Sequence, residues 1–417
     1  MRIIYLHQYF NTPEMSGGTR SYEMAKRMVA KGHDVHMITS YREPCENRSW
    51  VTSKIDGINV YWLPVQYTNK MSFLRRIKSF FEFAIKSSIK TASIKADIIF
   101  ATSTPLTIAL PAIYASKKQK IPMVFEVRDL WPEMPIAMGA LKNPISIFFA
   151  KFLEKFAYKN SAAINALSPG MKEGIISTGF PATKVSVIPN SSDISMFRVD
   201  KEFGYSFRKS RPWLKKNDPL LLYTGTFGLI NDLDSLVKIA LELCKINSEI
   251  KILAIGGGIR FKEVQKYAED LGVLNKNFFM EDYLKKKDVP SAISAATITT
   301  SLFLDKPEMQ KNSANKFFDS LAAGKPIMIN YGGWMNDLIK THSCGLAMWK
   351  TPYPKIAQEL NEKLYDENWL SSASKASAKL ADEYFDRDLL ASQLIELLEN
   401  VVDKKAEAAE SLAPGIY

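Results

Sequence analysis

The feature that most constrains the fold is a regular alternation of short apolar strands and helices along nearly the whole chain. Apolar stretches of strand length are followed by stretches with helical spacing of apolar residues. The expected strands are 3–7, 35–39, 58–63, 98–101, 123–127, 163–167, 185–188, 220–224, 251–255, 277–280, 298–302, 326–330 and 346–348. This order predicts the doubly wound α/β class, with parallel sheets covered by helices.

The alternation breaks once, in a polar stretch from Pro189 to Pro219 that we expect to be irregular. Because domains hold roughly 100–200 residues, the 417 residues suggest more than one. We expect an N-terminal Rossmann-like domain over 1–195 and a C-terminal one over 196–384. A terminal helix and frayed tail occupy 385–417, with the helix packing back towards the N-terminal domain. Two such domains facing each other would enclose a cleft at their strand ends, where open parallel sheets bind ligands.

The composition of the chain limits which kinds of partner are expected. Fifty-five Lys and Arg against 44 Asp and Glu give a formal charge of +11, which favours an anionic partner. No apolar run approaches the roughly 20 residues that span a bilayer, and the start reads as a strand rather than a signal peptide. The three cysteines and four histidines fit no metal-binding spacing, so we expect no metal and no cofactor. These features predict a cytoplasmic protein.

Two basic, aromatic segments could attach the protein to a membrane. Residues 73–86 interleave aromatic and aliphatic residues with cations that include Arg75, Arg76 and Lys78. Residues 145–159 place four phenylalanines among three lysines. Both suit an interfacial helix on anionic lipid, although an ordinary core helix with a solvated basic face would show the same pattern. Nucleic-acid binding would also explain the charge, but no recognition module is visible.

Candidate site residues of the first half follow its strands. Gly17 and Gly18 precede a helix whose amino end, with Arg20, could hold an anion. His7 ends the first strand. Arg128 and Asp129 close a buried strand within a run of three acids and one guanidinium, for which an ion pair at the strand end is the simpler alternative.

The second half repeats this arrangement. Gly225, Thr226 and Gly228 follow its first strand and could cradle phosphate with backbone N–H groups, and Gly257 lies in a glycine run after the next strand. The segment 315–326 predicts a short helix that ends at Gly324 in the left-handed conformation. Its residues Asn315, Lys316 and Asp319 place a cation and a carboxylate near the helix start.

These motifs, in this order, resemble the retaining GT-B glycosyltransferases that use nucleotide sugars (group 1, family 4). The resemblance rests on the segments Ser16–Gly18, Gly32–Val35, Ile188–Asp193, the glycine run at 256–258 and residues 319–326. The segment 127–133 is similar to a bacterial branch that builds O-antigen and capsule, some members of which transfer N-acetyl-fucosamine. The resemblance implies a metal-independent enzyme that moves a sugar from its UDP form to a lipid-linked saccharide with retention.

Several positions depart from the family pattern. Asp319 matches the second acid of the E-x7-E motif, which grips the ribose, whereas the first falls on Lys311, with Glu308 nearby but out of register. The usual phosphate-binding Arg and Lys are replaced by Thr226 and Asn231. The resemblance makes Lys316 the substitute cation.

In the N-terminal half, Arg128 stands where many relatives carry a His, and Asp129 is expected to contact donor sugar or acceptor. His7, Arg20 and the 75–78 cations are expected at the acceptor or membrane. We expect the enzyme to attach peripherally to the inner face of the cytoplasmic membrane. A GT-B sugar-nucleotide epimerase remains an alternative, as does a nucleic-acid-binding protein.

Overall fold

The computed structural model describes residues 1–15, 17–42, 49–67 and 71–403, so that Ser16, Cys45 and the tail expected to fray lie outside it. The chain forms two compact units. The first holds residues 1–189 together with the segment from Leu390 onward, and the second holds residues 190–389. Helix α16 (Arg387–Val402) begins in the second unit and continues in the first.

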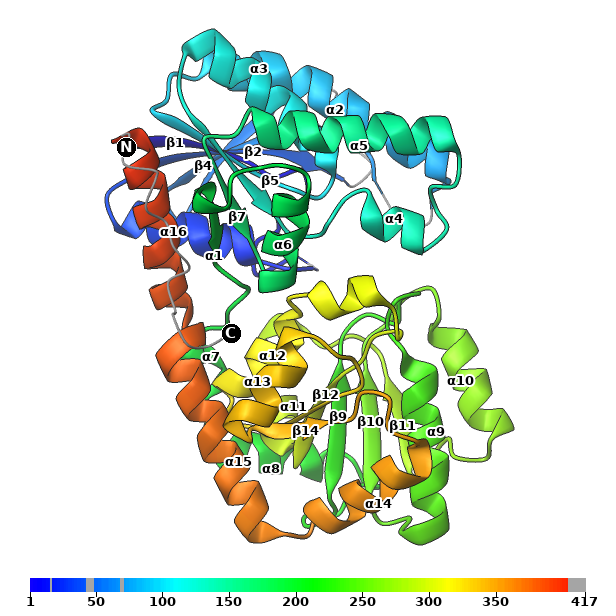
Figure 1. Cartoon of the computed structure of the whole chain (residues 1–417). Coiled ribbons are helices and arrows are strands. Elements are labelled where there is room, and N and C mark those ends of the chain that lie inside the picture. The colour runs from blue at the N-terminus through cyan, green and yellow to red at the C-terminus, as the bar shows by residue number, and fades with distance from the viewer. Residues whose placement is uncertain (16, 43–48, 68–70, 404–417) are drawn as a thin grey trace. The chain divides into compact units, whose positions relative to one another are not determined.

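The first unit is built on an eight-stranded sheet in the order β3-β4-β2-β1-β5-β6-β7-β8 (Figure 1). Its strands are β1 (Arg2–Leu6), β2 (Asp34–Tyr41), β3 (Val51–Ile55), β4 (Ile58–Pro64), β5 (Ile98–Thr102), β6 (Met123–Val127), β7 (Ala163–Ala166) and β8 (Val185–Val187). Its helices are α1 (Arg20–Ala30), α2 (Phe73–Ser93), η1 (Leu106–Ile108), α3 (Ala109–Gln119), α4 (Glu133–Ala137), α5 (Pro144–Lys159), α6 (Pro169–Ser177) and η2 (Ala182–Lys184).

Helices cover both faces of this sheet. Apolar residues of α3, α5 and α6 share one core with strands β1, β5, β6 and β7, while α1 lies on the opposite face (Figure 1). All pairings are parallel except β3 with β4, which is antiparallel. The carboxyl ends of the parallel strands therefore meet at one edge of the sheet, where the loops carry the candidate residues.

The second unit has a six-stranded parallel sheet in the order β11-β10-β9-β12-β13-β14. Its strands are β9 (Leu220–Thr224), β10 (Lys251–Ile255), β11 (Phe278–Glu281), β12 (Ile298–Ser301), β13 (Ile327–Ile329) and β14 (Gly345–Ala347). Its helices are α7 (Ile194–Phe197), α8 (Lys201–Lys209), α9 (Leu233–Ile246), α10 (Phe261–Asp270), η3 (Lys286–Asp288), α11 (Val289–Ala295), η4 (Pro307–Lys311), α12 (Asn315–Ala322), α13 (Trp334–His342), α14 (Tyr353–Lys363), α15 (Glu367–Leu380) and η5 (Ala381–Phe385).

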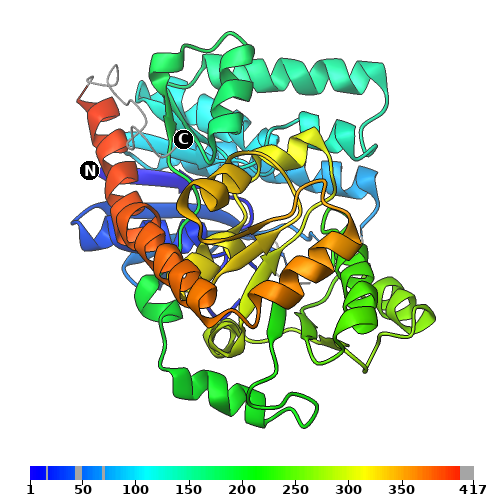
Figure 2. The same ribbon diagram turned by 60° about the horizontal axis from the view of Figure 1, so that its bottom comes forward.

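Strand β9 shows why this sheet is buried on both sides. Leu221 and Tyr223 belong to the core under α9 and α14, whereas Leu220 and Leu222 belong to the core under α8 and α11. Because successive side chains point to opposite faces, an unbroken apolar strand must be covered twice. The two views show helices on both sides of the sheet (Figures 1 and 2).

The predicted fold class is confirmed, and each expected strand overlaps an observed one. Two local expectations were wrong. Strand β3 was not predicted from the sequence, and the stretch 189–219, which was expected to be irregular, contains α7 and α8. In α8, the Asp200 side chain accepts a hydrogen bond from the Glu202 amide, which begins the helix. A Cβ at Gly204 would lie 2.8 Å from the carbonyl carbon of Ser294, so a glycine lets α8 pack closely on α11.

Candidate functional site

The first unit brings several predicted residues together at the carboxyl edge of its sheet. Strands β1, β5 and β6 are neighbours, and they are followed by His7, Ser103 and Arg128 respectively. Arg128 donates from Nη1 to Nε2 of His7 over 3.2 Å, and its backbone amide donates to Oγ of Ser103 over 3.0 Å. The loops after three adjacent strands thus form one hydrogen-bonded group.

These contacts determine the tautomer and the protonation state of His7. Because a guanidinium can only donate, Nε2 of His7 accepts, and the proton sits on Nδ1, which lies 2.8 Å from Oγ of Ser21. Burial lowers the pKa of His7 well below its ordinary value, and the charges of Arg128 and Arg42 lower it further. His7 is therefore a neutral imidazole that orients Arg128.

Arg20, which the sequence suggested as an acceptor contact, is buried and fully engaged. Its guanidinium contacts Glu126 at 2.9 Å and donates to the carbonyl oxygens of Pro189 at 2.7 Å and Ile188 at 3.1 Å. Burial alone would raise the pKa of Glu126, but the charge and hydrogen bonds of Arg20 bring it below its ordinary value. These contacts give Arg20 a structural role that ties α1 to the end of the first unit.

Asp129 and the Gly17-Gly18 pair are the exposed members of this edge. Asp129 accepts a hydrogen bond from Oγ1 of Thr104 over 3.2 Å. Gly17 has φ of +125°, and a Cβ there would lie 2.6 Å from Nδ2 of Asn11. That side-chain amide donates to the carbonyl of Gly18, so a hydrogen bond inside the loop stabilises its conformation.

In the second unit, two glycine loops meet at the carboxyl ends of β9 and β10. The amide of Gly225 donates to the carbonyl of Ile255 over 2.9 Å. A Cβ at Gly256 would lie only 1.8 Å from the carbonyl oxygen of Gly225, so this approach requires glycine. Both residues have positive φ, 149° and 146°, which suits glycine alone.

Lys316, from the first turn of α12, reaches over this loop. A Cβ on Gly225 would lie 3.1 Å from its Nζ, so the bare backbone leaves room for the ammonium. The Nζ donates to the hydroxyl of Tyr223 over 3.2 Å and lies 4.6 Å from the ring centroid of the same residue. Burial lowers the pKa of Lys316 to about 8, opposed by the charge of Asp319.

Asp319 follows one turn later on α12. Its Oδ1 accepts a hydrogen bond from the Ser192 hydroxyl over 2.7 Å. Burial raises the pKa of Asp319 to about 6, although the bond from Ser192 and the charge of Arg387 act against the rise. The structure thus places the predicted cation and carboxylate on one helix beside the loop at Gly225. It adds the contact between Ser192 and Asp319, which sequence reasoning missed because the two residues lie 127 positions apart.

The remaining predicted residues of this unit surround the same loops. Thr226 and Asn315 are exposed, and the carbonyl of Thr226 accepts from the Tyr223 hydroxyl over 2.7 Å. A Cβ at Gly228 would lie 3.0 Å from Oδ1 of Asn231. Gly257 lies under the ring of Tyr283, whose hydroxyl donates to the Gly257 carbonyl over 2.6 Å.

Tyr283 had not been singled out from the sequence. Its side chain is 67% exposed although its hydroxyl is anchored, so it offers an aromatic face beside the glycine loop.

Helix α2 carries the predicted membrane cations. Arg75 and Lys78 are exposed and Arg76 is half-buried. The same helix exposes large apolar residues, of which Leu74 is 78%, Ile85 66% and Ile89 72% exposed.

Among the described residues, no helix is both long and apolar enough to cross a bilayer. No cluster of three or more His, Cys, Asp or Glu side chains among the same residues could hold a metal ion. The expectation of a metal-independent enzyme stays a prediction.

Two doubly wound units with ligand loops at their strand ends define a protein of the GT-B class, and solved structures bear this out. HepE of Anabaena, solved in complex with UDP and glucose, aligns with a TM-score of 0.72 at 16% identity, over 96% of this chain and 100% of its own. WaaG, a glycosyltransferase involved in lipopolysaccharide biosynthesis, aligns with a TM-score of 0.69 at 14% identity, over 95% and 99%. The fold is GT-B.

Sequence comparison points the same way. Residues 17–191 match the family model of the glycosyl transferase 4-like domain. A protein of Escherichia coli K12, named as the colanic acid biosynthesis glycosyl transferase WcaI, is 24% identical over 282 residues, which are 64% of this chain and 69% of WcaI. The chain is therefore similar to glycosyltransferases over residues 17–191, and it has the GT-B fold.

Proposed function

We propose that this protein transfers a sugar from a UDP-sugar to a lipid-linked saccharide during the synthesis of a cell-surface polysaccharide. Three findings support the proposal: the family match over residues 17–191, the relative named for colanic acid biosynthesis, and the HepE complexes with UDP and UDP-glucose. The sugar is an N-acetylated amino sugar such as N-acetyl-fucosamine, as the resemblance of residues 127–133 implies.

The observation that carries the proposal is the position of Lys316 over the loop at Gly225. The amides of Gly225 and Phe227 already donate to the carbonyls of Ile255 and Gly257, so the ammonium acts with the N–H groups of Thr226 and Gly228. Together they can hold the diphosphate, whose negative charge grows as the sugar leaves. Asp319 binds the ribose hydroxyls, and Gly257 with Tyr283 lies beside the base. One cation on a helix thus replaces the two cations of the usual family pattern.

Transfer proceeds with retention of the anomeric configuration and without a metal. The sugar develops oxocarbenium character, and the acceptor hydroxyl attacks from the face that the diphosphate leaves. Asp129 contacts the donor sugar or the acceptor, and Arg128 is positioned by His7 and Ser103. No side chain serves as nucleophile in this scheme.

A lipid-linked acceptor requires the enzyme to work at a membrane surface. Helix α2 supplies cations at Arg75, Arg76 and Lys78 beside exposed apolar residues, which is the composition of an interfacial helix. The protein therefore attaches peripherally to the inner face of the cytoplasmic membrane.

Nucleotide binding tests the site. UDP at a hundred times its dissociation constant stabilises the native state by about 2.7 kcal/mol, so it should raise the unfolding temperature of the wild type. Lys316→Ala and Asp319→Ala should lose this shift and most of the transfer activity. The control Lys340→Ala removes an exposed lysine from the same unit and should behave as wild type.

The outcomes separate the alternatives. Normal turnover in both Lys316→Ala and Asp319→Ala would show that the site is misplaced. Release of UDP from the donor without any acceptor would indicate an epimerase. A gel shift with DNA or RNA that weakens with salt, without a UDP effect, would indicate a nucleic-acid-binding protein.

A further inference from the structure

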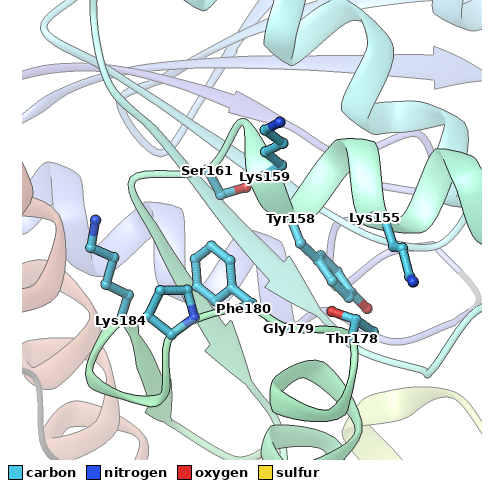
Figure 3. Close-up of a pocket in the computed structure, with 9 residues that line it drawn as sticks. Lys155, Tyr158, Lys159, Ser161, Thr178, Gly179, Phe180 and Lys184 are labelled. Carbon is cyan, nitrogen blue, oxygen red and sulfur yellow. The ribbon is translucent and has the colours of Figure 1, made fainter.

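A pocket of about 470 Å³ lies in the first unit between the second half of α5 and the segment that joins α6 to β8. Lys155 and Lys159 line it from α5, and Lys184 lines it from η2. Tyr158 and Phe180 supply aromatic walls. In Figure 3, Lys184 and Lys155 lie at opposite ends of the lining, with Phe180 and Tyr158 between them. Three lysines thus line one partly apolar hollow.

Within the described part of the chain, the lining of this pocket contains lysines but no acidic residue, and no ion pair engages its three lysines. The acid next to Lys155 on α5, Glu154, is buried and accepts a hydrogen bond from Tyr158 over 3.2 Å. Three lysines offer hydrogen-bond donors and no acceptor, so the pocket suits an anion with several oxygens, such as a phosphate group.

The pocket is separate from the candidate site. Ser161 and Lys184, which line it, come just before β7 and β8, so the pocket lies at the amino edge of the sheet. His7 and Arg128 follow strands and lie at the carboxyl edge. The pocket therefore has a different role from binding the donor nucleotide.

Helix α5 extends from the pocket with an exposed apolar stripe. Ile145, Phe148, Phe149 and Phe152 are 67%, 66%, 63% and 60% exposed. A core helix with a solvated basic face would bury its phenylalanines, so that interpretation of residues 145–159 does not fit. Large exposed aromatic clusters on a soluble unit mark an interaction surface.

The stripe and the pocket share one line along the helix. Phe148 and Phe152 are four residues apart, Lys155 follows three residues later, and Lys159 four residues after that, which is the spacing of one helical face. The helix starts at the carboxyl edge, after β6, and ends at the amino edge, before β7. Aromatic residues therefore occupy the end near the candidate site, and lysines the end at the pocket.

We propose that α5 docks on an anionic phospholipid bilayer, with its aromatic stripe among the acyl chains and a lipid phosphate in the pocket of Lys155, Lys159 and Lys184. Aromatic side chains enter the headgroup boundary while lysines pair with anionic headgroups, and here both occur on one face. The proposal extends the membrane attachment proposed for α2, and it rests on that function only for the presence of the same bilayer.

The test is cosedimentation with vesicles of phosphatidylglycerol and phosphatidylcholine in equal parts. Lys155→Gln, Lys159→Gln and Lys184→Gln, combined, should weaken binding by about tenfold or more, because each cation near such a surface contributes measurably. The matched control combines Lys117→Gln, Lys118→Gln and Lys151→Gln, which remove the same charge from α3 and α5 outside the pocket. Equal losses of vesicle binding in the two triple variants would show that net charge alone attracts the protein to the vesicles, and would overturn the proposal that the pocket binds a lipid phosphate.

Two further arms identify the source of the phosphate. Phe148→Ser with Phe152→Ser should weaken vesicle binding while every lysine remains, whereas unchanged binding would exclude insertion of the stripe. Two results together would assign the pocket to free phosphate and overturn the proposal of a lipid. Inorganic phosphate would raise the unfolding temperature of the wild type but not that of the pocket variant, and the wild type would bind pure phosphatidylcholine and mixed vesicles equally.

The pocket variant also keeps the two proposals distinguishable. Its unfolding temperature should still rise with UDP, because the donor loops belong to the other unit. A wild type that binds anionic vesicles through the pocket but shows no response to UDP would contradict the proposed function alone.

Discussion

Arg20 shows that burial decides what a charged residue does. From the sequence it stands beside two glycines at a helix start, which suggests an anion contact. In the structure its side chain is 3% exposed and every part of the guanidinium contacts Glu126 or a carbonyl oxygen. A buried cation whose three nitrogens all donate inside the protein has a structural role and is poorly placed to bind a ligand.

This contact predicts a large effect on stability. Arg20→Ala leaves the Glu126 carboxylate buried without its partner, which costs about 3–5 kcal/mol in such pairs. The control is Arg2→Ala, which breaks an ion pair with Asp34 whose side chains are 49% and 42% exposed and which should cost about 1 kcal/mol or less. Urea unfolding measures both, and similar losses would refute the argument from burial.

The buried carboxyl of Glu154 predicts that the stability of the protein depends on pH. Burial raises its pKa to about 7, as does Glu133, while the bond from Tyr158 and the charges of Lys151 and Lys155 oppose the rise. In the unfolded chain this carboxyl titrates near 4.3, so the folded state binds more protons between these values. The protein therefore loses stability as pH rises from about 4.3 to about 7, by up to about 4 kcal/mol from this group.

Glu154→Gln should remove that loss. The variant is expected to be more stable than wild type in urea at pH 8 and about equal at pH 5, since the neutral amide can still accept from Tyr158. Glu173→Gln, at an exposed position of α6, is the control and should change little at either pH. A variant that is less stable than wild type at pH 8 would mean that the charged carboxylate is favoured where it lies.

At the scale of elements, α12 combines the two titrating groups of the donor site. Burial raises the pKa of Asp319 to about 6 and lowers that of Lys316 to about 8, so both are charged only between these values. We expect kcat/KM for the donor to fall below about pH 6 as Asp319 takes a proton, and above about pH 8 as Lys316 loses one.

The two limbs can be assigned by substitution. Lys316→Arg keeps its charge at high pH, so the alkaline limb should move upward, and Asp319→Asn should abolish the acid limb whatever its effect on rate. The profiles are measured from about pH 5 to pH 9 at saturating acceptor. An alkaline limb that stays in place in Lys316→Arg would belong to another group.

Elements were easier to predict than contacts. The apolar strands follow from hydrophobic runs alone, but β3 has an exposed, alternating pattern typical of an edge. Its signal was the Asp56-Gly57 pair, whose φ values of 46° and 82° form the tight turn to β4. The helix with Lys316 and Asp319 was predictable from its local pattern, whereas Ser192 and Ser103 reach their partners only through the fold.

At the scale of the whole molecule, charge and exposed apolar surface act together. The chain carries a formal charge of +11, and α2 places Arg75, Arg76 and Lys78 beside Leu74, which is 78% exposed. A net charge alone attracts any anion over about 10 Å at moderate salt, but only a local cluster on an apolar face fixes one orientation at a bilayer.

Arg75→Gln, Arg76→Gln and Lys78→Gln, combined, should therefore weaken binding to phosphatidylglycerol vesicles by up to about a hundredfold, since each cation near an anionic surface contributes about 1 kcal/mol. Lys26→Gln, Lys31→Gln and Lys54→Gln remove the same charge from exposed positions elsewhere in the first unit and should have a much smaller effect. Binding of the wild type should also decline as salt rises, because screening shortens the reach of the exposed cations. If the two triple variants bind alike, net charge governs attachment and α2 has no special part in it.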